Sequence, residues 1–331
     1  MSEWIAAAAR GLGEYVLGDT FAYNPVFLLT SCGIAMLYWR ATRSNGSMLP
    51  FIFPKGLYSH RSTRVDIAMM VFNSLFIGLG GLSFGILAPT VASVTMLLLN
   101  GQLSDSQTAM MGPISAAAFV LVLVLIEDFC RYAIHFIHHK VPVIWPFHAV
   151  HHSAEVLTPI TFFRAHPVYF YLQQCLIGMV VGAAQGVFAA LALGFIPSWT
   201  FAAAALVSRT YMLTGVHLRH SHIQLSYGRA LEHVLISPRL HQVHHSAERR
   251  HYDRNFGEIF ALWDWFFGTL YIPKTREQYD FGLTDENGAK IQPFPTIGAA
   301  LLRPFAQSAK AVRMFYWGKA QPTSQSSGEA A

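Results

Sequence analysis

Hydrophobic positions along this chain gather into four long blocks without any Asp, Glu, Lys or Arg, at residues 24–39, 67–99, 113–126 and 165–208. A helix that crosses a membrane needs about 20 consecutive apolar residues. The last block is long enough for two such helices, with a turn at Gly194 and Pro197. The block at 67–99 is long for one helix, and its GLGG sequence at 78–81 marks either a kink or a re-entrant turn. The pattern therefore predicts an all-α fold, a multi-span transmembrane helical bundle.

The two ends of the chain have different patterns. Within residues 1–17 one helical face is apolar, formed by Trp4, Ile5, Ala8, Leu12, Tyr15 and Val16. This face predicts a helix that either lies along the membrane interface or packs on its neighbours. Glu3, Glu14 and the lack of a basic segment argue against a secretory signal. From Gly318 onward the residues are small and polar, which predicts a disordered tail.

Composition supports a membrane location. The chain is 53% hydrophobic and only 12% charged, whereas soluble domains are about 25% charged. The basic residues behind the net charge of +5 concentrate in one loop, at Arg40, Arg43, Lys55, Arg61 and Arg64, while residues 100–112 contain no Lys or Arg. Since basic loops face the cytoplasm, residues 42–66 and the segments after Arg131 and Arg209 are expected there. We therefore expect an integral protein of a bacterial inner membrane, with no nucleic-acid partner.

Histidines supply the candidate chemistry. The octapeptide HAVHHSAE at 148–155 recurs as HQVHHSAE at 241–248. In a helix, residues at i, i+3 and i+4 lie close together, so each copy is expected to present its three imidazoles as one patch. His135 and His139 form a further i, i+4 pair. The candidate metal ligands are thus His135, His139, His148, His151, His152, His241, His244 and His245, with His217, His220 and His222 as additional candidates.

So many imidazoles indicate more than one metal ion. Neutral imidazole binds zinc, iron, copper and nickel, and one tetrahedral zinc ion uses four ligands. Eight to ten ligands therefore suit two ions that keep open positions. Cys32, Cys130 and Cys175 lack a CxxC spacing, which disfavours thiolate and iron–sulfur sites. The alternatives are a pH-responsive histidine patch and a metal transporter, although a transporter would place histidines and acids within the spans.

An acidic residue lies on the helical stripe of the first histidine pair. Asp128, Tyr132, His135 and His139 are spaced to share one face. Asp128 is at the membrane end of that stripe, where an ionisable residue is a functional candidate. We expect it either to orient an imidazole as a hydrogen-bond acceptor or to pair with Arg131.

Four segments together resemble one known family. The runs DFCRYAIHFIHH, HAVHHSAEVLTPITFFRAHP, HSHIQLSYGRALEHVLISPRLHQVHHS and NFGEIFALWDWFFGTLY are similar to the fatty acid hydroxylase superfamily, also called the sterol desaturase family, over residues 128–273. The resemblance implies a cytoplasmic helical cap that carries a His-rich di-iron site and uses dioxygen. It places as ligands the eight histidines of the i, i+4 pair and the two octapeptides, which form three histidine boxes, and it adds His220. His138 is a further candidate that either acts beside the ligands or lies exposed. His138 and Asp128, the acidic residue of the helical stripe, are the candidate catalytic residues.

The resemblance also divides the chain into three parts. Residues 1–112 are expected to form interfacial and transmembrane helices, residues 113–273 the catalytic region, and residues 274–331 a cytoplasmic extension that ends in the disordered tail. Two positions depart from the family pattern. His138 makes HFIHH in place of the commoner HRxxH, and Lys140 stands where the alkylglycerol monooxygenase branch has an acidic residue. The difference at Lys140 argues against a pterin-dependent ether-lipid activity.

The reaction that the resemblance implies is oxidation of an unactivated C–H bond in a membrane lipid. Hydroxylation is the main expectation, and desaturation by the same site is the alternative. Since the chain has no haem or dinucleotide motif, its electrons are expected from a separate protein, a ferredoxin-like or cytochrome b5-like donor with its reductase. Arg249, Arg250 and Arg254 are a candidate docking patch for that donor. A degenerate, non-catalytic scaffold is disfavoured because all eight box histidines are present.

Overall fold

The computed structural model describes residues 25–42, 46–78, 86–100, 112–191 and 196–317. The predicted interfacial helix at 1–17, most of the GLGG segment, Gly194 and the tail from Gly318 lie outside these residues. The described helices are α2 (Pro25–Ala41), α3 (Met48–Ile52), α4 (Lys55–Tyr58), α5 (Arg61–Gly78), α6 (Leu87–Asn100), α7 (Pro113–Lys140), α8 (Trp145–His152), α9 (Pro167–Ala190), α10 (Ser198–Met212), α11 (Pro238–His244), α12 (Leu262–Phe266) and α13 (Ile297–Trp317). Single turns connect them at η2 (Pro159–Phe163), η3 (Val216–His220), η4 (Leu231–His233) and η5 (Arg249–His251).

The described part of the chain is mostly helical, as predicted, with one exception. Strands β1 (Leu283–Thr284) and β2 (Lys290–Ile291) form a small antiparallel hairpin. The purely all-α prediction was therefore wrong in this detail. Gly288, at a φ of 84° between the two strands, adopts the left-handed conformation that the reversal requires.

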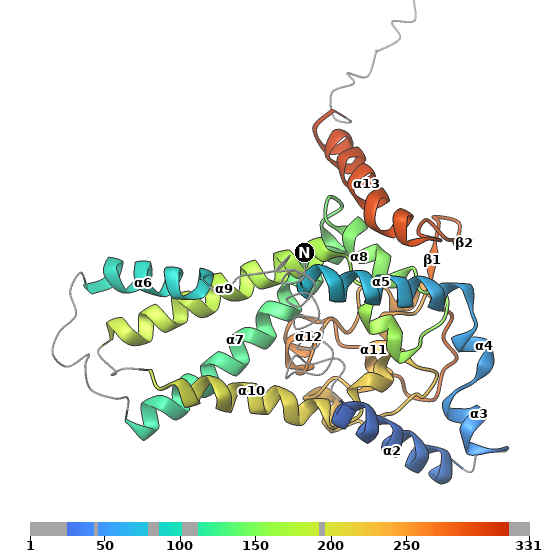
Figure 1. Ribbon diagram of the computed structural model, residues 1–331, viewed down its shortest axis with the longest axis horizontal. Coiled ribbons are helices and arrows are strands. Elements are labelled where there is room, and N and C mark those ends of the chain that lie inside the picture. The colour runs from blue at the N-terminus through green and yellow to red at the C-terminus, as the bar shows by residue number, and fades with distance from the viewer. Residues whose placement is uncertain (1–24, 43–45, 79–85, 101–111, 192–195, 318–331) are drawn as a thin grey trace, which may run out of the picture.

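The helices form two regions (Figure 1). Helices α6, α7, α9 and α10 lie side by side in an elongated bundle, and α8, α11 and α12 gather with their connecting loops at one end of it. Within the described ranges, two helices, α7 and α9, are long and apolar enough to cross a membrane. Helix α6 and residues 26–41 of α2 are also apolar but shorter. The apolar block at 67–99 contains two helices, α5 and α6, and the block at 165–208 contains α9 and most of α10.

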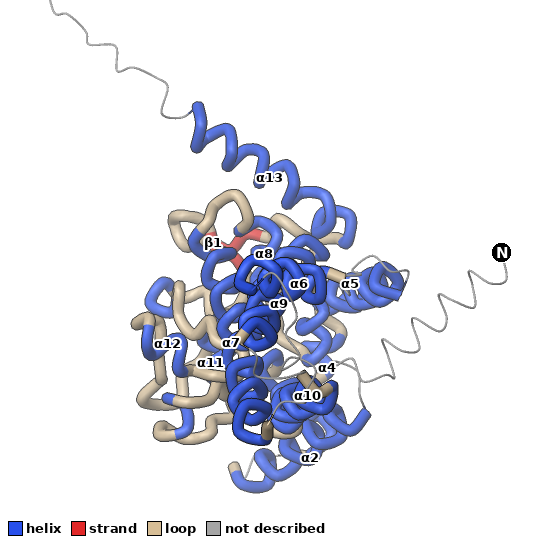
Figure 2. The backbone as a smooth tube through the Cα atoms, turned by 90° about the vertical axis from the view of Figure 1, so that its left-hand side faces the viewer, coloured by secondary structure: helices blue, strands red, loops and turns tan. Residues whose placement is uncertain are grey.

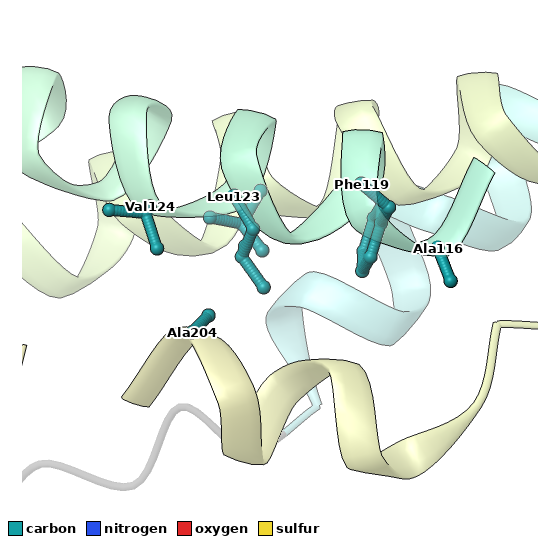
Figure 3. Close-up of a cluster of buried hydrophobic side chains, with 6 residues drawn as sticks. Ala116, Phe119, Leu123, Val124 and Ala204 are labelled. Atoms are coloured by element: carbon teal, nitrogen blue, oxygen red, sulfur yellow. The ribbon is translucent and has the colours of Figure 1, made fainter. Parts of the chain in front are cut away.

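Helix α7 connects the bundle to the other region. Pro113 lies in its first turn, where the missing N–H costs nothing, and the helix ends where Val141 turns extended ahead of Pro142. Its bundle half packs Ala116, Phe119 and Leu123 toward α9 and α10 (Figure 3). The ring of Phe119 contacts the rings of Phe188 and Phe201 at centroid distances of 5.1 and 5.6 Å. Its other half carries the first histidine pair.

Glycines set the close packing of α9 on α6. Gly178, Gly182 and Gly186 recur every four residues along the face that meets α6. A Cβ added at Gly182 would lie 2.5 Å from the carbonyl oxygen of Ala88, and one at Gly186 2.6 Å from that of Ala92. Small residues at this spacing are typical of helix pairs in membranes. The packing is therefore of the membrane type, although the sequence interpretation did not use these glycines.

Candidate metal centre

Nine histidines meet where α7 ends and where α8, η3 and α11 surround its last turns. They form two groups, in each of which the ligand nitrogens all lie within 4.8 Å of one another. Cluster A contains His135, His139, His148, His152 and His244, and cluster B contains His151, His220, His241 and His245. These are the eight box histidines together with His220. His217 and His222, the other two additional candidates, lie outside both groups.

The imidazoles face one another through their Nε2 atoms. In cluster A, the Nε2 of His152 lies 3.1 to 3.2 Å from those of His139, His148 and His244. In cluster B, the Nε2 of His220 lies 2.9 to 3.2 Å from those of the other three histidines. The clusters are adjacent, since the rings of His152 and His245 stack at a centroid distance of 4.6 Å.

Each of the two octapeptides supplies histidines to both clusters. The i and i+4 residues of the first octapeptide, His148 and His152, belong to cluster A, whereas its i+3 residue, His151, belongs to cluster B. The second octapeptide does the reverse: His241 and His245 lie in cluster B and His244 in cluster A. The expectation that each box forms one patch was therefore wrong. This is an exchange of histidines: α8 contributes His151 to cluster B, and α11 contributes His244 to cluster A.

The electrostatics of the site favour bound cations. Burial and neighbouring imidazoles lower the pKa of the histidines outside α7, to about 3 for His151 and well below the usual value for His148, His152, His220, His241, His244 and His245. The imidazoles are therefore neutral at pH 7. A neutral ring that donates through Nδ1 presents a lone pair at Nε2, and several lone pairs about 3 Å apart need a cation between them. The residues present thus fit two metal ions.

Backbone carbonyl groups orient three of the rings. The Nδ1 of His135 donates to the Phe256 carbonyl oxygen at 2.8 Å, and that of His244 to the Arg254 carbonyl oxygen at 2.8 Å. His151 makes the same kind of contact with the Arg164 carbonyl oxygen at 3.3 Å. Such hydrogen bonds fix the tautomer that leaves Nε2 free to bind a metal.

The known protein families agree with this geometry. The model of the Fatty acid hydroxylase family matches residues 120–269, which hold all nine clustered histidines. This segment belongs to the fatty acid hydroxylase family. The match confirms the resemblance predicted from the sequence motifs.

The names of similar curated proteins are those of enzymes that act on lipids. Ornithine lipid hydroxylase OlsE of Rhizobium tropici is 30% identical over 198 residues, 58% of this chain and 52% of that protein. Alkylglycerol monooxygenase of Homo sapiens is 29% identical over 157 residues, 47% of this chain and 31% of that protein, and the Caenorhabditis elegans enzyme of the same name is 26% identical over 162 residues, 49% and 29%. The chain thus spans about half the length of these relatives or less. No solved structure matches it.

A loop of the hydroxylase segment holds the Phe256 carbonyl group in place. Asp264 accepts hydrogen bonds from the N–H groups of Phe256 and Gly257 at 2.8 and 2.7 Å. Asn255 adopts a φ of 56° and donates to the Leu240 carbonyl oxygen of α11 at 3.0 Å. These residues connect the ligand-bearing helices α7 and α11. The sequence motifs contained them, but sequence reasoning assigned them no role.

Asp128 has a different role from the one expected. Its carboxylate accepts hydrogen bonds from the N–H groups of Ile259 and Phe260 at 2.9 and 3.1 Å and from the Trp263 indole at 2.9 Å. None of these partners is an imidazole or Arg131, so both interpretations of Asp128 need correction. It binds the loop after Gly257 to α7 and acts on the metal centre only through that loop.

Other predicted residues lie beside the clusters. His138 is fully buried, so the expectation that it might be exposed was wrong; its Nδ1 donates to the Ile134 carbonyl oxygen at 2.8 Å, and its ring lies 4.8 Å from that of Tyr169. Lys140, the residue that departs from the alkylglycerol monooxygenase pattern, forms an ion pair with Asp253.

A buried arginine behind α8 was missed by sequence reasoning. Arg164 is fully buried, and its guanidinium donates to Asp66 of α5 at 2.9 Å, to the Val150 carbonyl oxygen at 2.9 Å and to the Ser153 hydroxyl at 2.8 Å. Its own carbonyl oxygen accepts from His151. Arg164 therefore fixes both the helix that carries the second box and one ligand on it.

Two cavities with no lining residue in common reach the histidines. The smaller, of about 120 Å³, lies between α7 and α9 and is lined by histidines of both clusters together with Arg131, Tyr169, Phe170 and Gln173. The larger, of about 470 Å³, opens beside the β hairpin and is lined by His139, His152, His244 and His245 with Trp145 and Tyr252. The metal centre is thus accessible both from the candidate spans and from the region around the hairpin.

Replacing Gly257 with alanine is expected to destabilise the hydroxylase segment by about 1–3 kcal/mol. A Cβ at this position would lie 2.5 Å from the Phe260 carbonyl oxygen and 2.8 Å from the Ile236 side chain. The measurement is the midpoint of thermal unfolding in detergent. Gly298→Ala is the matched control, since no atom lies within 4 Å of the added Cβ. Equal midpoints for the two variants would contradict the prediction.

Proposed function

We propose that this chain hydroxylates an unactivated C–H bond of a membrane lipid with dioxygen, at two iron ions held by the nine clustered histidines. The observation that carries the proposal is that two adjacent imidazole clusters lie at the inner end of a cavity between the candidate spans. The fatty acid hydroxylase match and the lipid-hydroxylating relatives support the same reaction class.

Each cluster would hold one ion. The five imidazoles of cluster A and the four of cluster B are neutral donors, which iron accepts. When bound, the two ions supply the dioxygen activation that attack on an unactivated C–H bond requires. The protein positions the donors through the carbonyl oxygens of Phe256, Arg254 and Arg164 and excludes water by burying the rings. Asp128 and His138 are positioning residues in this proposal, because neither lies within a cluster.

The cavity between α7 and α9 is the proposed approach of the substrate. Its aromatic lining, Tyr169 and Phe170, suits an acyl chain, whereas Arg131, Gln173 and the Arg219–Glu258 pair suit polar groups. Burial raises the pKa of Glu258, but the nearby positive charges, chiefly that of Arg219, outweigh burial, so the pKa lies below the usual value and the carboxylate is ionised. A volume of about 120 Å³ admits a few substrate atoms beside the ions. The substrate is therefore proposed to be an amphiphilic lipid whose oxidised carbon lies near its polar head.

The proposed setting is a multi-span membrane bundle with a cytoplasmic cap. Helices α6, α7, α9 and α10 would cross the bilayer, and α8, α11 and the following loops would form the cap that carries the histidines. The concentration of basic residues in the loop at 40–64 supports a cytoplasmic cap in a bacterial inner membrane. The proposed three-part division of the chain at 112 and 273 follows the same boundaries, although Asp66 of the first part contacts Arg164 of the second.

Electrons are proposed to enter through the larger cavity from a separate ferredoxin-like or cytochrome b5-like donor. This cavity reaches four histidines from the side of the cap, and Arg249 lies near it on η5. Of the three arginines in the predicted patch, Arg250 pairs with Glu248 and Glu277, and Arg254 donates to the Gly268 carbonyl oxygen. The net positive potential of the patch is therefore smaller than the sequence indicated.

Reversing the charge of Arg249 is expected to slow turnover with the protein donor several-fold. The reason is that an acidic donor loses an attractive charge during association. The measurement compares Arg249→Glu with the unchanged chain, using the native donor in one series and a chemical reductant in the other. With the chemical reductant, Arg249→Glu should turn over as fast as the unchanged chain. If the two proteins were also equally fast with the native donor, this docking site would be excluded.

The function is tested by comparing membrane lipids of cells with and without the protein. Hydroxylation predicts a lipid that gains one oxygen atom, and the gain should disappear in a His220→Ala variant. A lipid that loses two hydrogen atoms would identify a desaturase instead. If the lipids were unchanged and vesicles that contain the protein took up iron, the chain would be a transporter and the proposal would be overturned.

A further inference from the structure

Helix α13 carries an apolar stripe on its exposed side. Positions 302, 305, 309, 312 and 316 repeat every three or four residues and therefore share one face. Leu302 is 70% exposed and Phe305 53% exposed. Ala300 and Leu301, near the beginning of the helix, pack on α8 and α5 on the side next to the stripe. The stripe continues beyond this contact, where Tyr316 is 68% exposed.

Basic residues flank this stripe. Arg303, Lys310 and Arg313 are all exposed, and α13 contains no Asp or Glu. Projected around the helix, the three basic positions fall within one sector next to the apolar stripe. A helix with an apolar face beside a purely basic one is typical of a segment that lies in the interface of an anionic membrane.

The beginning of α13 is fixed to the start of a candidate span. The Nε2 of His166 donates to the Leu301 carbonyl oxygen at 3.0 Å, and the ring of Phe305 contacts those of His166 and Phe147 at 5.5 and 5.1 Å. His166 is the N-cap of α9 and accepts from the N–H of Val168. Helix α13 therefore leaves the body at the level where α9 begins.

The direction of α13 differs from that of the spans. Figure 1 shows it projecting away from the bundle, and in Figure 2, where α6 and α9 are seen end-on, α13 is seen along its length. It thus runs across the axis of these helices. If α9 crosses a bilayer, its first residue lies near the bilayer surface. Helix α13 is attached there and runs across the axis of α9, so it then runs along that surface.

We propose that α13 lies on the membrane surface, with its apolar stripe among the acyl chains and its basic residues among anionic phospholipid headgroups. A second copy of this chain is the competing occupant, since the spacing of the stripe also fits a coiled coil. However, in a dimer of α13 the charged residues beside the apolar contact would all be basic, because the helix contains no Asp or Glu to pair with them. The charge pattern therefore favours the lipid surface. This proposal does not depend on the metal chemistry.

Spin labels on neighbouring residues test the proposal in the full-length chain. Cys32, Cys130 and Cys175 are replaced by alanine, and one label is attached through Ala309→Cys, on the stripe, or through Lys310→Cys, on the basic side. The labelled proteins are reconstituted into vesicles of phosphatidylethanolamine and phosphatidylglycerol. Accessibility to oxygen, which partitions into acyl chains, is compared with accessibility to a water-soluble nickel complex.

The Ala309 label should be several-fold more accessible to oxygen than to the nickel complex, and the Lys310 label should show the reverse. Adding Lys310→Glu and Arg313→Glu to the Ala309→Cys chain should lower its oxygen-to-nickel ratio in these vesicles and leave it unchanged in phosphatidylcholine vesicles. Equal nickel accessibility at the two positions would overturn the proposal. Dipolar broadening between Ala309 labels of different chains would also overturn it and would identify a second copy as the occupant.

Discussion

Replacing His152 with alanine is expected to abolish lipid oxidation, lowering turnover by more than about a hundredfold, and to reduce bound iron from two atoms per chain to below one. The Nε2 of His152 lies within 3.2 Å of three other ligand nitrogens of cluster A, and its ring stacks on His245 of cluster B. Its loss therefore affects both clusters. The measurements are metal content after anaerobic loading and turnover of the purified chain.

The matched control for this substitution is His233→Ala. His233 is half-buried on the turn η4, and among the described residues its Nδ1 contacts only the Arg229 carbonyl oxygen. This variant should keep two iron atoms and normal turnover. Retention of two iron atoms by His152→Ala, in correctly folded protein, would exclude His152 as a ligand and contradict the assignment of cluster A.

Replacing Arg164 with methionine is expected to lower the free energy of unfolding by about 3–5 kcal/mol, since it leaves the buried Asp66 carboxylate without its cation. Both side chains are completely buried, and the guanidinium also holds α8 through Val150 and Ser153. The midpoint of thermal unfolding should fall, and the affinity for metal should fall with it. The measurement is unfolding in detergent, with and without iron.

A surface ion pair on α5, the helix that also carries Asp66, provides the comparison for the Arg164 substitution. Arg61 pairs with Glu155 at 2.7 Å, but its side chain is 73% exposed. Arg61→Met should therefore lower the free energy of unfolding far less than Arg164→Met, because solvent screens an exposed ion pair. The double variant with Asp66→Leu and Arg164→Met should be more stable than Arg164→Met alone, because no unpaired charge stays buried. If the double variant were the less stable, the ion pair would not explain the effect of Arg164.

Hydrophobic patterning predicted the helical class and the apolar helices, since the spacing of apolar residues is a local property. It did not predict how α6 and α9 meet, because Gly178, Gly182 and Gly186 become meaningful only when a second helix is placed against them. The β hairpin was missed for a related reason. Two strands of two residues each leave almost no periodic signal.

Histidine spacing, together with the family resemblance for His220, identified the residues of both clusters but not how they divide between them. On an α-helix, i+4 lies about 40° to one side of i and i+3 about 60° to the other. His148 and His152 therefore point into one cluster, and His151 into the other. The supporting residues were harder to find, because Asp66 and Arg164 are 98 positions apart in the sequence. A contact of that kind depends on tertiary folding and leaves no local pattern.

The exchange of histidines between α8 and α11 has a consequence for how the centre fills. An ion bound in cluster A would immobilise His148, His152 and His244, and would thereby order both helices that carry residues of cluster B. The second ion then binds to a site whose conformational entropy has already been lost. Metal uptake should therefore be cooperative, so that a half-loaded population contains mainly chains with two ions and chains with none.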